Sequence, residues 1–567
     1  MARTIGIGNQ NFETIRQEGY FYIDKTDFIR EWWESGDNVT LITRPRRFGK
    51  TLNMSMLENF FSVNYADRTD MFQGLKIWEN EKYRKLQGTY PVLFLSFADI
   101  KETSFQEARN KICKIIQMTY NKFHFLLESN ILNDNEKMDF QRISADMENY
   151  MASLSLKMLS DYLYRHYGKK VVILLDEYDT PMQEAYVNGY WEELVAFTKS
   201  LFNSTFKTNP YLERAIMTGV TRISKESIFS DLNNLEVVTT TSGKYADCFG
   251  FTENEVFAAL EEYSLSERKD EVKQWYNGFT FGSHTDIYNP WSILNYLDKQ
   301  KVDCYWANSS SNSLVDRLVR EGSPDIKMTM SRLLRGGTFH TTFDEQIVFN
   351  QLDRGDDAVW SLLLASGYLK VVNHEFSIAK RRAEYVLKLT NMEVQMMFEQ
   401  MIAGWFGKCR RINNAFLQAM LDNDLTAMNT YMNKVTSEMF SYFDTGSTPS
   451  GEGAERFYHG FMLGLVVELA DRYVITSNRE SGYGRYDVML EPRNVVSGQE
   501  DPAIILEFKV QDSKEKNLSN TVQNALRQIT EKNYQANLAA KGIPEKCIRK
   551  YGVAFCGKNV LIGNTEE

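Results

Sequence analysis

The stretch "VTLITRPRRFGKTL", residues 39–52, decides the fold of the N-terminal part of the chain. It begins as a short apolar run, typical of a buried strand, and it ends in Gly49, Lys50 and Thr51. At a turn from a strand into a helix, free backbone N–H groups and the helix dipole favour a bound anion. Lys50 can reach the β- and γ-phosphates of a nucleotide, and the Thr51 hydroxyl can hold Mg²⁺. The stretch therefore predicts a phosphate-binding loop.

The start of this loop departs from the usual pattern, in which a glycine stands five positions before the glycine of the Gly-Lys pair. Arg44 occupies that position, and Pro45 follows it without a backbone N–H group. The positive charge of Arg44, Arg46 and Arg47 is expected to offset the lost donor in part. Because a Gly-Lys-Thr tripeptide also occurs in ordinary basic turns, the loop alone leaves that interpretation open.

A second apolar run, residues 171–175 of the stretch "VVILLDEYD", is followed directly by the acidic residues Asp176 and Glu177. Phosphoryl transfer to water needs one carboxylate to orient Mg²⁺, and it benefits from another that positions or activates the attacking water. Adjacent residues at the carboxyl end of a strand can supply both, at the edge where open α/β sheets bind ligands. The loop followed by this acidic strand end favours a nucleotide site over a basic turn and a solvated strand end.

Further apolar runs at residues 91–97 and 214–219 are predicted to be strands, with helical stretches between them. Uniformly apolar strands that alternate with helices predict a parallel sheet covered by helices on both faces. We assign residues 1–250 to this α/β domain. From residue 251 to residue 443 helices dominate, with one strand-like patch near "SGYLKVV", and this region can contain a winged-helix-like unit.

The segment 444–454, "DTGSTPSGEGA", is rich in Gly, Ser and Thr and predicts a linker. The pattern changes after it, where residues 455–567 form a separate predicted domain. A helical stretch is followed there by strand-like runs, a second helix and a last pair of short strands. This order indicates a second, smaller α/β domain.

Two strand-like runs of this domain, "GRYDVML" and "AIILEFKV", carry acidic residues. Because strand side chains alternate between faces, Glu507 and Lys509 share one face, and a hairpin can bring Asp487 beside Glu507. Two carboxylates so placed repel unless a divalent cation lies between them, and oxygen ligands suit Mg²⁺ or Mn²⁺. Lys509 can then lower the pKa of a metal-bound water or stabilise a pentavalent phosphate. An isolated Glu-x-Lys also arises on exposed, salt-bridging strand faces.

The composition argues against several classes of protein. The 567-residue chain carries a net charge of −10, which disfavours a protein that coats nucleic acid but allows a local binding groove. The six cysteines lie far apart without CxxC pairs and the six histidines are scattered, so we expect no Cys/His transition-metal centre. Because no apolar run reaches membrane-spanning length and no signal-peptide core is present, we expect a cytoplasmic protein that does not act on a membrane.

Several longer motifs resemble the predicted AAA-ATPase-like family of bacterial and archaeal proteins: "FYIDKTDFI", "TRPRRFGKTL", "LLDEYDTP", "TGVTRISKESIFSDLNNL" and "WYNGFTFG". In that family Arg-Pro-Arg-Arg-Phe-Gly-Lys-Thr is the normal loop, so the resemblance makes Arg44 a family feature. The family belongs to the P-loop ATPases with an additional catalytic glutamate, which implies Glu177 as the base. Thr218 resembles a sensor of the γ-phosphate, and Arg222 resembles a stabiliser of the developing charge.

This resemblance implies ATP as the ligand and Mg²⁺ as its metal ion. The residues expected to bind the nucleotide are Arg47, Phe48, Gly49, Lys50, Thr51, Asp176 and Thr218. Of these, Thr51 and Asp176 are the expected metal ligands. The aromatic segment "WYNGFTFG" is expected to pack at a domain junction without a catalytic role.

The part after the linker resembles the PD-(D/E)XK nuclease superfamily, through "ERFYHGFMLGL", "SNRESGYGRYD", "ILEFKV" and "ALRQITEKNY". The residues that match its D-x(n)-E-x-K signature are Asp487, Glu507 and Lys509. The resemblance adds Glu455 as an acidic helix position that assists metal binding, and Gln528 with Tyr534 as further candidates. The expected metal ligands are Glu455, Asp487 and Glu507. Since the superfamily also contains members that have lost cleavage, an inactive binding module is an alternative.

The expected architecture is an α/β multidomain chain with a P-loop NTPase sheet, a helical middle region and a C-terminal nuclease-like fold. The expected function is that of an ATP-hydrolysing protein whose fused metal-dependent nuclease acts on DNA or RNA. An alternative is a STAND-like signalling switch, with slow nucleotide exchange, homo-oligomerisation and a C-terminal interaction module. A nucleotide-binding scaffold in which both sites are inactive is a third interpretation.

Overall fold

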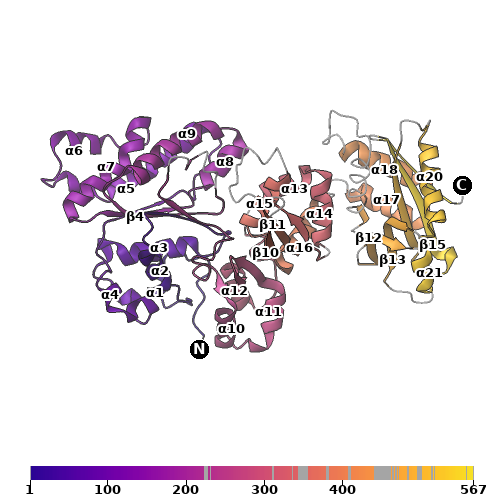
Figure 1. The fold of residues 1–567 in the computed structure, drawn as a ribbon, viewed down its shortest axis with the longest axis horizontal. Helices are drawn as coiled ribbons and strands as arrows, with labels where there is room; N and C mark the ends of the chain where they lie inside the picture. The colour runs from indigo at the N-terminus through magenta and orange to yellow at the C-terminus, as the bar shows by residue number, and fades with distance from the viewer. Residues whose placement is uncertain are drawn as a thin grey trace. The chain divides into compact units, whose positions relative to one another are not determined.

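The computed structural model describes residues 2–222, 228–229, 232–309, 312–334, 336–342, 356–377, 382–405, 410–439, 462, 465–466, 469, 471–481, 484–493, 501–511, 515, 517–556 and 559–565. The chain forms two compact units (Figure 1). The first unit comprises Met1–Leu314 and Gly336–Met397, and the second comprises Val315–Arg335 and Phe398–Glu567. Each unit has its own sheets and its own hydrophobic core.

The first unit is built around a five-stranded sheet in the order β2-β3-β4-β1-β5, with every neighbouring pair parallel. Its strands are β1 (Val39–Thr43), β2 (Val92–Ser96), β3 (Val171–Asp176), β4 (Leu212–Gly219) and β5 (Leu235–Val238). Every residue of β1 and β3 is buried, which explains why both are uniformly apolar apart from threonines and the last aspartate. The predicted parallel sheet is confirmed.

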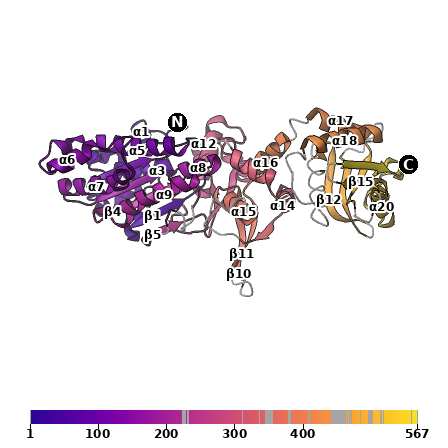
Figure 2. The ribbon, with the colours of Figure 1, turned by 90° about the horizontal axis from the view of Figure 1, so that it is seen from above.

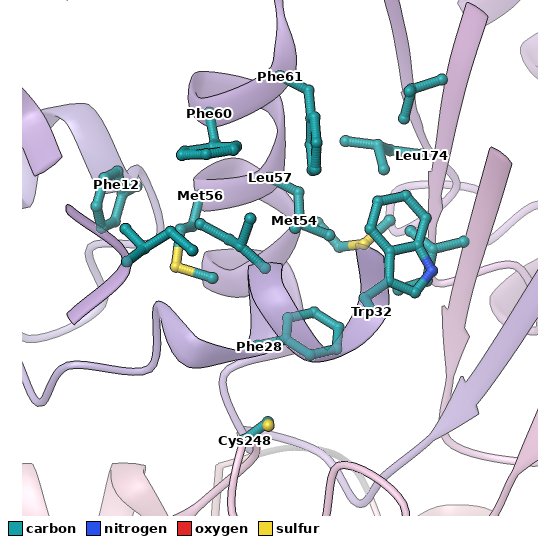
Figure 3. Close-up of a cluster of buried hydrophobic side chains, with 14 of the residues drawn as sticks. Phe12, Phe28, Trp32, Met54, Met56, Leu57, Phe60, Phe61, Leu174 and Cys248 are labelled. Atoms are coloured by element: carbon teal, nitrogen blue, oxygen red, sulfur yellow. The ribbon is translucent and has the colours of Figure 1, made fainter. Parts of the chain in front are cut away.

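Helices cover both faces of this sheet (Figure 1). They are α1 (Phe12–Gln17), α2 (Asp27–Ser35), α3 (Lys50–Phe61), α4 (Glu81–Arg84), α5 (Phe105–Asn121), α6 (Asp134–Gln141), α7 (Asn149–Tyr167), α8 (Thr180–Asn188) and α9 (Trp191–Phe202). The α2–α3 face holds a buried cluster in which Met54, Leu57 and Phe61 of α3 lie beside Trp32 and Leu174 (Figure 3). No helix in the described part of the chain is long and apolar enough to cross a membrane.

A group of short strands and helices follows the parallel sheet along the chain, within the first unit. It consists of β6 (Phe251–Thr252), α10 (Glu253–Glu262), α11 (Lys269–Tyr276), β7 (Asn277–Phe281), β8 (His284–Tyr288) and α12 (Pro290–Lys299). The three strands form an antiparallel sheet in the order β6-β8-β7. The sequence pattern did not predict these short strands. The aromatic segment 275–282 forms the end of α11, all of β7 and the residue after it.

The next elements of the first unit are β9 (Phe339–Thr341), α15 (Asp356–Ala365), β10 (Leu369–Ser377) and β11 (Arg382–Leu389). The strands pair antiparallel in the order β10-β11-β9, and β10 with β11 forms a hairpin (Figure 2). These elements follow one another as a strand, a helix and a hairpin, and the winged-helix-like unit stays a prediction. Residues 359–364 of α15 are all buried, so this helix exposes little surface that could contact the bases of a nucleic acid.

The second unit contains a five-stranded sheet in the order β12-β13-β14-β15-β16. Its strands are β12 (Tyr473–Ser481), β13 (Gly484–Pro492), β14 (Ala503–Val510), β15 (Ile548–Cys556) and β16 (Asn559–Asn564). β14 and β15 are parallel, and the other neighbours are antiparallel. The helices are α14 (Pro324–Leu334), α17 (Arg410–Asp422), α18 (Leu425–Met439), α20 (Leu518–Glu531) and α21 (Ala536–Ala540). Two more, α13 (Ser313–Glu321) and α16 (Met392–Trp405), begin in the first unit and end in the second.

The two faces of this second sheet pack against different helices. Met420 of α17 and Met428 of α18 share a buried cluster with Leu506 on one face, whereas Ile529 of α20 packs with Ile505 on the other. The sequence pattern predicts α17 and α18 as part of the middle region, upstream of a boundary at residue 443, and does not indicate the sheet that they cover. The predicted linker 444–454 lies outside the described residues.

Two asparagines of α18 complete the hydrogen bonding of β16, the last strand of this sheet. Asn433 donates to Val560 O at 2.7 Å and accepts from Val560 N at 2.9 Å. Asn429 makes the same pair of bonds with Ile562, at 2.9 and 2.8 Å. Because the two asparagines are four residues apart, they meet alternate residues of the strand. They satisfy groups that an edge strand otherwise leaves open.

Candidate functional site

A buried arginine holds the turn that follows β1. The fully buried guanidinium of Arg44 donates hydrogen bonds to the backbone oxygens of Thr43 at 3.0 Å and Thr239 at 2.7 Å. A further bond reaches Lys244 O at 3.2 Å. The guanidinium carbon lies 4.4 Å from the ring centroid of Phe281, at cation–π distance. Burial lowers the pKa of Arg44 to about 9, so the group stays charged at neutral pH.

This placement corrects the expectation that Arg44 supplies positive charge to a phosphate. The two terminal nitrogens of its guanidinium donate to carbonyl oxygens, and its backbone N–H donates to Gly219 O at 3.1 Å. Since Pro45 has no N–H group, neither residue offers a backbone donor to an anion. The residue that replaces the usual glycine therefore anchors the loop, and donors for an anion come from the residues after it.

The next loop residues contact the segment downstream of the sheet. Arg47 has a left-handed backbone with φ 64°, and its guanidinium carbon lies 4.4 Å from the ring centroid of Trp291. The buried ring of Phe48 packs edge-on against Phe279 at 4.7 Å and Phe281 at 5.4 Å. The aromatic segment 275–282 thus packs against the phosphate-binding loop. The Phe48 side chain is part of this cluster, so only its backbone is left for a nucleotide.

The loop ends where α3 begins. Gly49 adopts φ 78°, in the left-handed region that favours glycine, and no side chain caps the first turn of α3. The buried Lys50 ammonium donates to Arg44 O at 3.1 Å and Pro45 O at 3.0 Å, so it bridges the two ends of the loop. Burial lowers the pKa of Lys50, and nearby acidic groups oppose that shift. The helix N-terminus and the ammonium group together form a site with the chemistry that phosphate requires.

Asp176 brings three of the predicted residues together. Its Oδ2 accepts a hydrogen bond from Thr51 Oγ1 at 2.7 Å, and its Oδ1 accepts one from Thr218 Oγ1. Burial raises the pKa of Asp176, and the hydrogen bonds from the two hydroxyls oppose this shift. β3 and β1 both neighbour β4, so the carboxyl ends of the three strands meet at one edge of the sheet. That edge is where the sequence predicted a nucleotide site.

Glu177, the predicted base, has an unusual backbone conformation. Its φ is 52°, which is left-handed and costly for a residue with a side chain. The side chain is half-buried, and Oε2 accepts a hydrogen bond from Thr180 Oγ1 at 3.1 Å. Strained residues of this kind cluster at functional sites, and the role of Glu177 as the base stays a prediction.

Two residues of the same strand end, which the sequence analysis did not select, hold the loop after β4. Oδ2 of the buried Asp179 accepts from Val220 N at 2.9 Å, from Thr221 N at 2.7 Å and from Thr221 Oγ1 at 2.8 Å. Tyr178 Oη donates to Thr221 O at 2.8 Å. The half-buried Arg222, a predicted charge stabiliser, follows directly. Asp179, the second aspartate of the sequence Asp-Glu-Tyr-Asp, is the sequence feature that could have indicated these contacts with the loop after β4.

In the second unit, the two predicted carboxylates lie on neighbouring strands. β13 pairs Val488 with Leu506 of β14, which places Asp487 and Glu507 at the next positions along the two strands. Oδ2 of Asp487 accepts a hydrogen bond from Phe508 N at 2.8 Å. The alternate residues Met489 and Ile505 pack with α20, so both carboxylates belong to the face that α20 covers. The predicted juxtaposition is confirmed, although Glu507 is more deeply buried than a hairpin alone predicts.

Gln528 and Tyr534 join this face from the end of α20. Gln528 Nε2 donates to Glu507 Oε1 and, at 3.0 Å, to Tyr534 Oη. α20 ends at Glu531, and the left-handed Asn533, with φ 52°, turns the chain so that Tyr534 can reach back. Burial raises the pKa of Tyr534, and the nearby carboxylates add to that shift. The two side chains therefore meet although five residues separate them in the sequence.

Two other predicted residues are placed less fully. The half-buried Lys509 is two positions after Glu507 on β14, so both residues share one face of the strand. Glu455 lies outside the described residues. The roles assigned to both residues stay predictions.

The residues of both units fit the groups that their chemistry implies. In the first unit, the uncapped N-terminus of α3 suits a phosphate, and the buried Asp176 beside the Thr51 hydroxyl suits a divalent cation. In the second unit, Asp487 and Glu507 supply adjacent carboxylate oxygens, the ligand type that Mg²⁺ and Mn²⁺ prefer.

Comparison with known proteins agrees with this division. Residues 6–229 match a family described as predicted AAA-ATPase, and residues 453–565 match the PD-(D/E)XK nuclease superfamily. The chain is also similar along its length to a protein of Azotobacter chroococcum mcd 1 described as "Uncharacterized protein in vnfD 5'region". The two are 25% identical over 566 residues, covering 98% of this chain and 96% of that protein. The similarity therefore extends across both matched regions and the middle region between them.

Proposed function

We propose that the chain, which matches a predicted AAA-ATPase family and the PD-(D/E)XK nuclease superfamily, couples ATP hydrolysis to metal-dependent cleavage of nucleic acid. The single observation that supports the ATPase half of this proposal is the pair of hydrogen bonds that Asp176 accepts from Thr51 and Thr218. That contact gathers the end of the phosphate-binding loop and two strand ends at one point. Such a point suits a phosphate chain with its cation.

In this proposal each residue of the first unit has a separate task. Lys50 leaves the carbonyl groups of residues 44 and 45 and binds the phosphates of ATP. Bound Mg²⁺ supplies charge neutralisation of those phosphates. Glu177 accepts a proton from the attacking water. Thr218 holds Asp176 in place through the hydrogen bond that its hydroxyl donates. Arg222, held next to the clamped loop, stabilises charge on the transferred phosphoryl group.

In the second unit Asp487 and Glu507 would hold Mg²⁺ or Mn²⁺, which supplies a Lewis acid when bound. Gln528 fixes the rotamer of Glu507 through their hydrogen bond, and Tyr534 fixes Gln528 in turn. Lys509 stabilises negative charge on the phosphodiester. DNA or RNA is the proposed substrate class.

A STAND-like switch is the second candidate, and one feature of the first unit favours it. The phosphate-binding loop contacts Trp291, Phe279 and Phe281, which belong to the segment downstream of the sheet. A loop held from outside its own sheet is suited to reporting nucleotide binding to the rest of the chain. Slow ATP turnover with an ATP-dependent change in oligomeric mass would favour this candidate over a continuously cycling ATPase.

The test is a paired assay of ATP hydrolysis and nucleic-acid cleavage on the wild-type protein, Lys50→Ala and Glu507→Ala. We expect Lys50→Ala to lose ATP hydrolysis, because the phosphates lose their buried ammonium partner. Glu507→Ala should lose cleavage of DNA and RNA in Mg²⁺ or Mn²⁺ while hydrolysing ATP normally. Equal cleavage, or equal inertness, of wild type and Glu507→Ala with ATP turnover intact would refute the nuclease half.

A further inference from the structure

The backbone carbonyl of Arg46, in the middle of the phosphate-binding loop, accepts two hydrogen bonds from distant parts of the chain. Trp306 Nε1 donates to it at 2.9 Å and Asn289 Nδ2 at 3.2 Å. These donors follow Arg46 by 260 and 243 residues in the sequence. The adjacent Arg47 lies over Trp291, two residues after one of the donors. The middle of the loop is therefore fixed from outside the parallel sheet.

Both donors are themselves held in place. Asn289 caps α12, because its Oδ1 accepts from the backbone N–H groups of Trp291 at 2.9 Å and Ser292 at 3.4 Å. The indole of Trp306 is 4% exposed and packs against Phe279 and Tyr368, each with ring centroids 5.4 Å apart. Neither side chain can leave the Arg46 carbonyl without disturbing its own packing or cap.

One buried carboxylate joins the two donors. Glu393 Oε1 accepts from Trp306 N at 2.6 Å and Ala307 N at 3.3 Å, and Oε2 accepts from Ser292 Oγ at 2.9 Å. The side chain thus connects the start of α12, which Asn289 caps, with the turn that presents the Trp306 indole. Burying a carboxylate costs free energy unless hydrogen bonds compensate, and here three donors converge on it.

We propose that Trp306 and Asn289, held by Glu393, are positioning residues that fix the phosphate-binding loop for nucleotide. The inference rests on the proposed ATP site and adds residues that the family match at 6–229 does not cover. The loop needs outside support because its first residue, Arg44, is tied to the sheet and Pro45 provides no donor. Glu393 is the second residue of α16, and all the residues of this network belong to the first unit.

Two substitutions remove the donors and little else. Trp306→Phe keeps an aromatic ring but has no N–H group, and Asn289→Ser keeps a good helix cap but loses the amide donor. Each should raise KM for ATP about fivefold and leave kcat within about twofold, since one hydrogen bond contributes on the order of 1 kcal/mol. The double variant should show a larger rise in KM. Trp33→Phe, on α2, is the matched control and should behave as wild type.

A second readout does not depend on ATP. In the absence of nucleotide, backbone amides of residues 46–52 should exchange with deuterium faster in Trp306→Phe and Asn289→Ser than in wild type. Wild-type exchange together with wild-type KM in both variants would overturn the inference and leave the proposed function standing. Faster loop exchange in a protein that neither binds nor hydrolyses ATP would support the positioning role and overturn the ATPase proposal instead.

Discussion

The two acidic sites of this protein are built in opposite ways. The first is the strand-end site, formed by Lys50, Thr51, Asp176, Glu177 and Thr218. It lies at the carboxyl edge of a parallel sheet, where Thr51 and Asp176 form a hydrogen bond although they are 125 positions apart in the sequence. The sheet-face site (Asp487, Glu507, Lys509, Gln528 and Tyr534) lies on one side of a mixed sheet, and its hydrogen-bonded neighbours are about 20 positions apart or fewer in sequence.

This difference determines what each site depends on. The strand-end site is supported by loops. Asp179 holds one of them, and Trp306 holds the other from outside the signature motifs. The sheet-face site is supported by strand pairing and by α20, which lie inside the same domain. Remote substitutions should therefore affect the first site, whereas the second should respond only to its immediate neighbours.

The largest effect is expected at the strand-end site. Glu177→Gln should bind ATP with nearly wild-type affinity but hydrolyse it about 10³-fold more slowly, the scale of losing a general base. Steady-state hydrolysis and equilibrium nucleotide binding measure the two quantities separately. Glu192→Gln, an exposed residue in the first turn of α9, is the control. Hydrolysis at the wild-type rate in Glu177→Gln would assign the base to another residue.

The next effect concerns the anchor of the loop. Arg44→Gly restores the usual glycine, yet we expect it to destabilise the first unit by about 3 kcal/mol, because several buried carbonyl groups lose their donor. In thermal unfolding of the full chain, the midpoint temperature of the transition of the first unit should be lower than in wild type. Arg44→Lys keeps the charge without the branched donors and should fall between the two proteins. A glycine variant as stable as wild type would show that the anchor is dispensable.

A smaller effect is expected at the sheet-face site. Gln528→Ala should reduce nucleic-acid cleavage by roughly 10- to 100-fold, the range for a residue that orients a metal ligand. The exposed Gln523, on the same helix, provides the control substitution Gln523→Ala. ATP hydrolysis should be unchanged in both variants. A parallel loss of ATP hydrolysis would show that the effect of Gln528 extends beyond the sheet-face site.

The smallest effect tests the closure of the second sheet. Asn433→Ala should lower the free energy of unfolding of the second unit by about 1–2 kcal/mol, because Val560 loses both of its outward hydrogen bonds. The exposed Thr430 of the same helix offers the control substitution Thr430→Ala. Thermal unfolding followed by circular dichroism measures both. Equal stability would mean that water replaces the asparagine without cost.

The sequence was sufficient for the parts of the fold that repeat a simple pattern. The apolar runs at 39–43 and 171–176 matched β1 and β3, and the acidic pair in the C-terminal hairpin lies as its register predicted. It was insufficient where a side chain acts over a long distance. No local pattern shows that Arg44 turns toward Thr239, that Trp306 reaches Arg46, or that α17 and α18 cover the second sheet.

The asparagine pair on α18 has a consequence for how the chain is made. Chains emerge from the ribosome with their N-terminus first, so α18 is synthesised well before β16. When β16 finally leaves the exit tunnel, Asn429 and Asn433 are already available to bond its outer side. The bonded strand then offers fewer open backbone groups to other newly made chains, for which an open sheet border is a docking point.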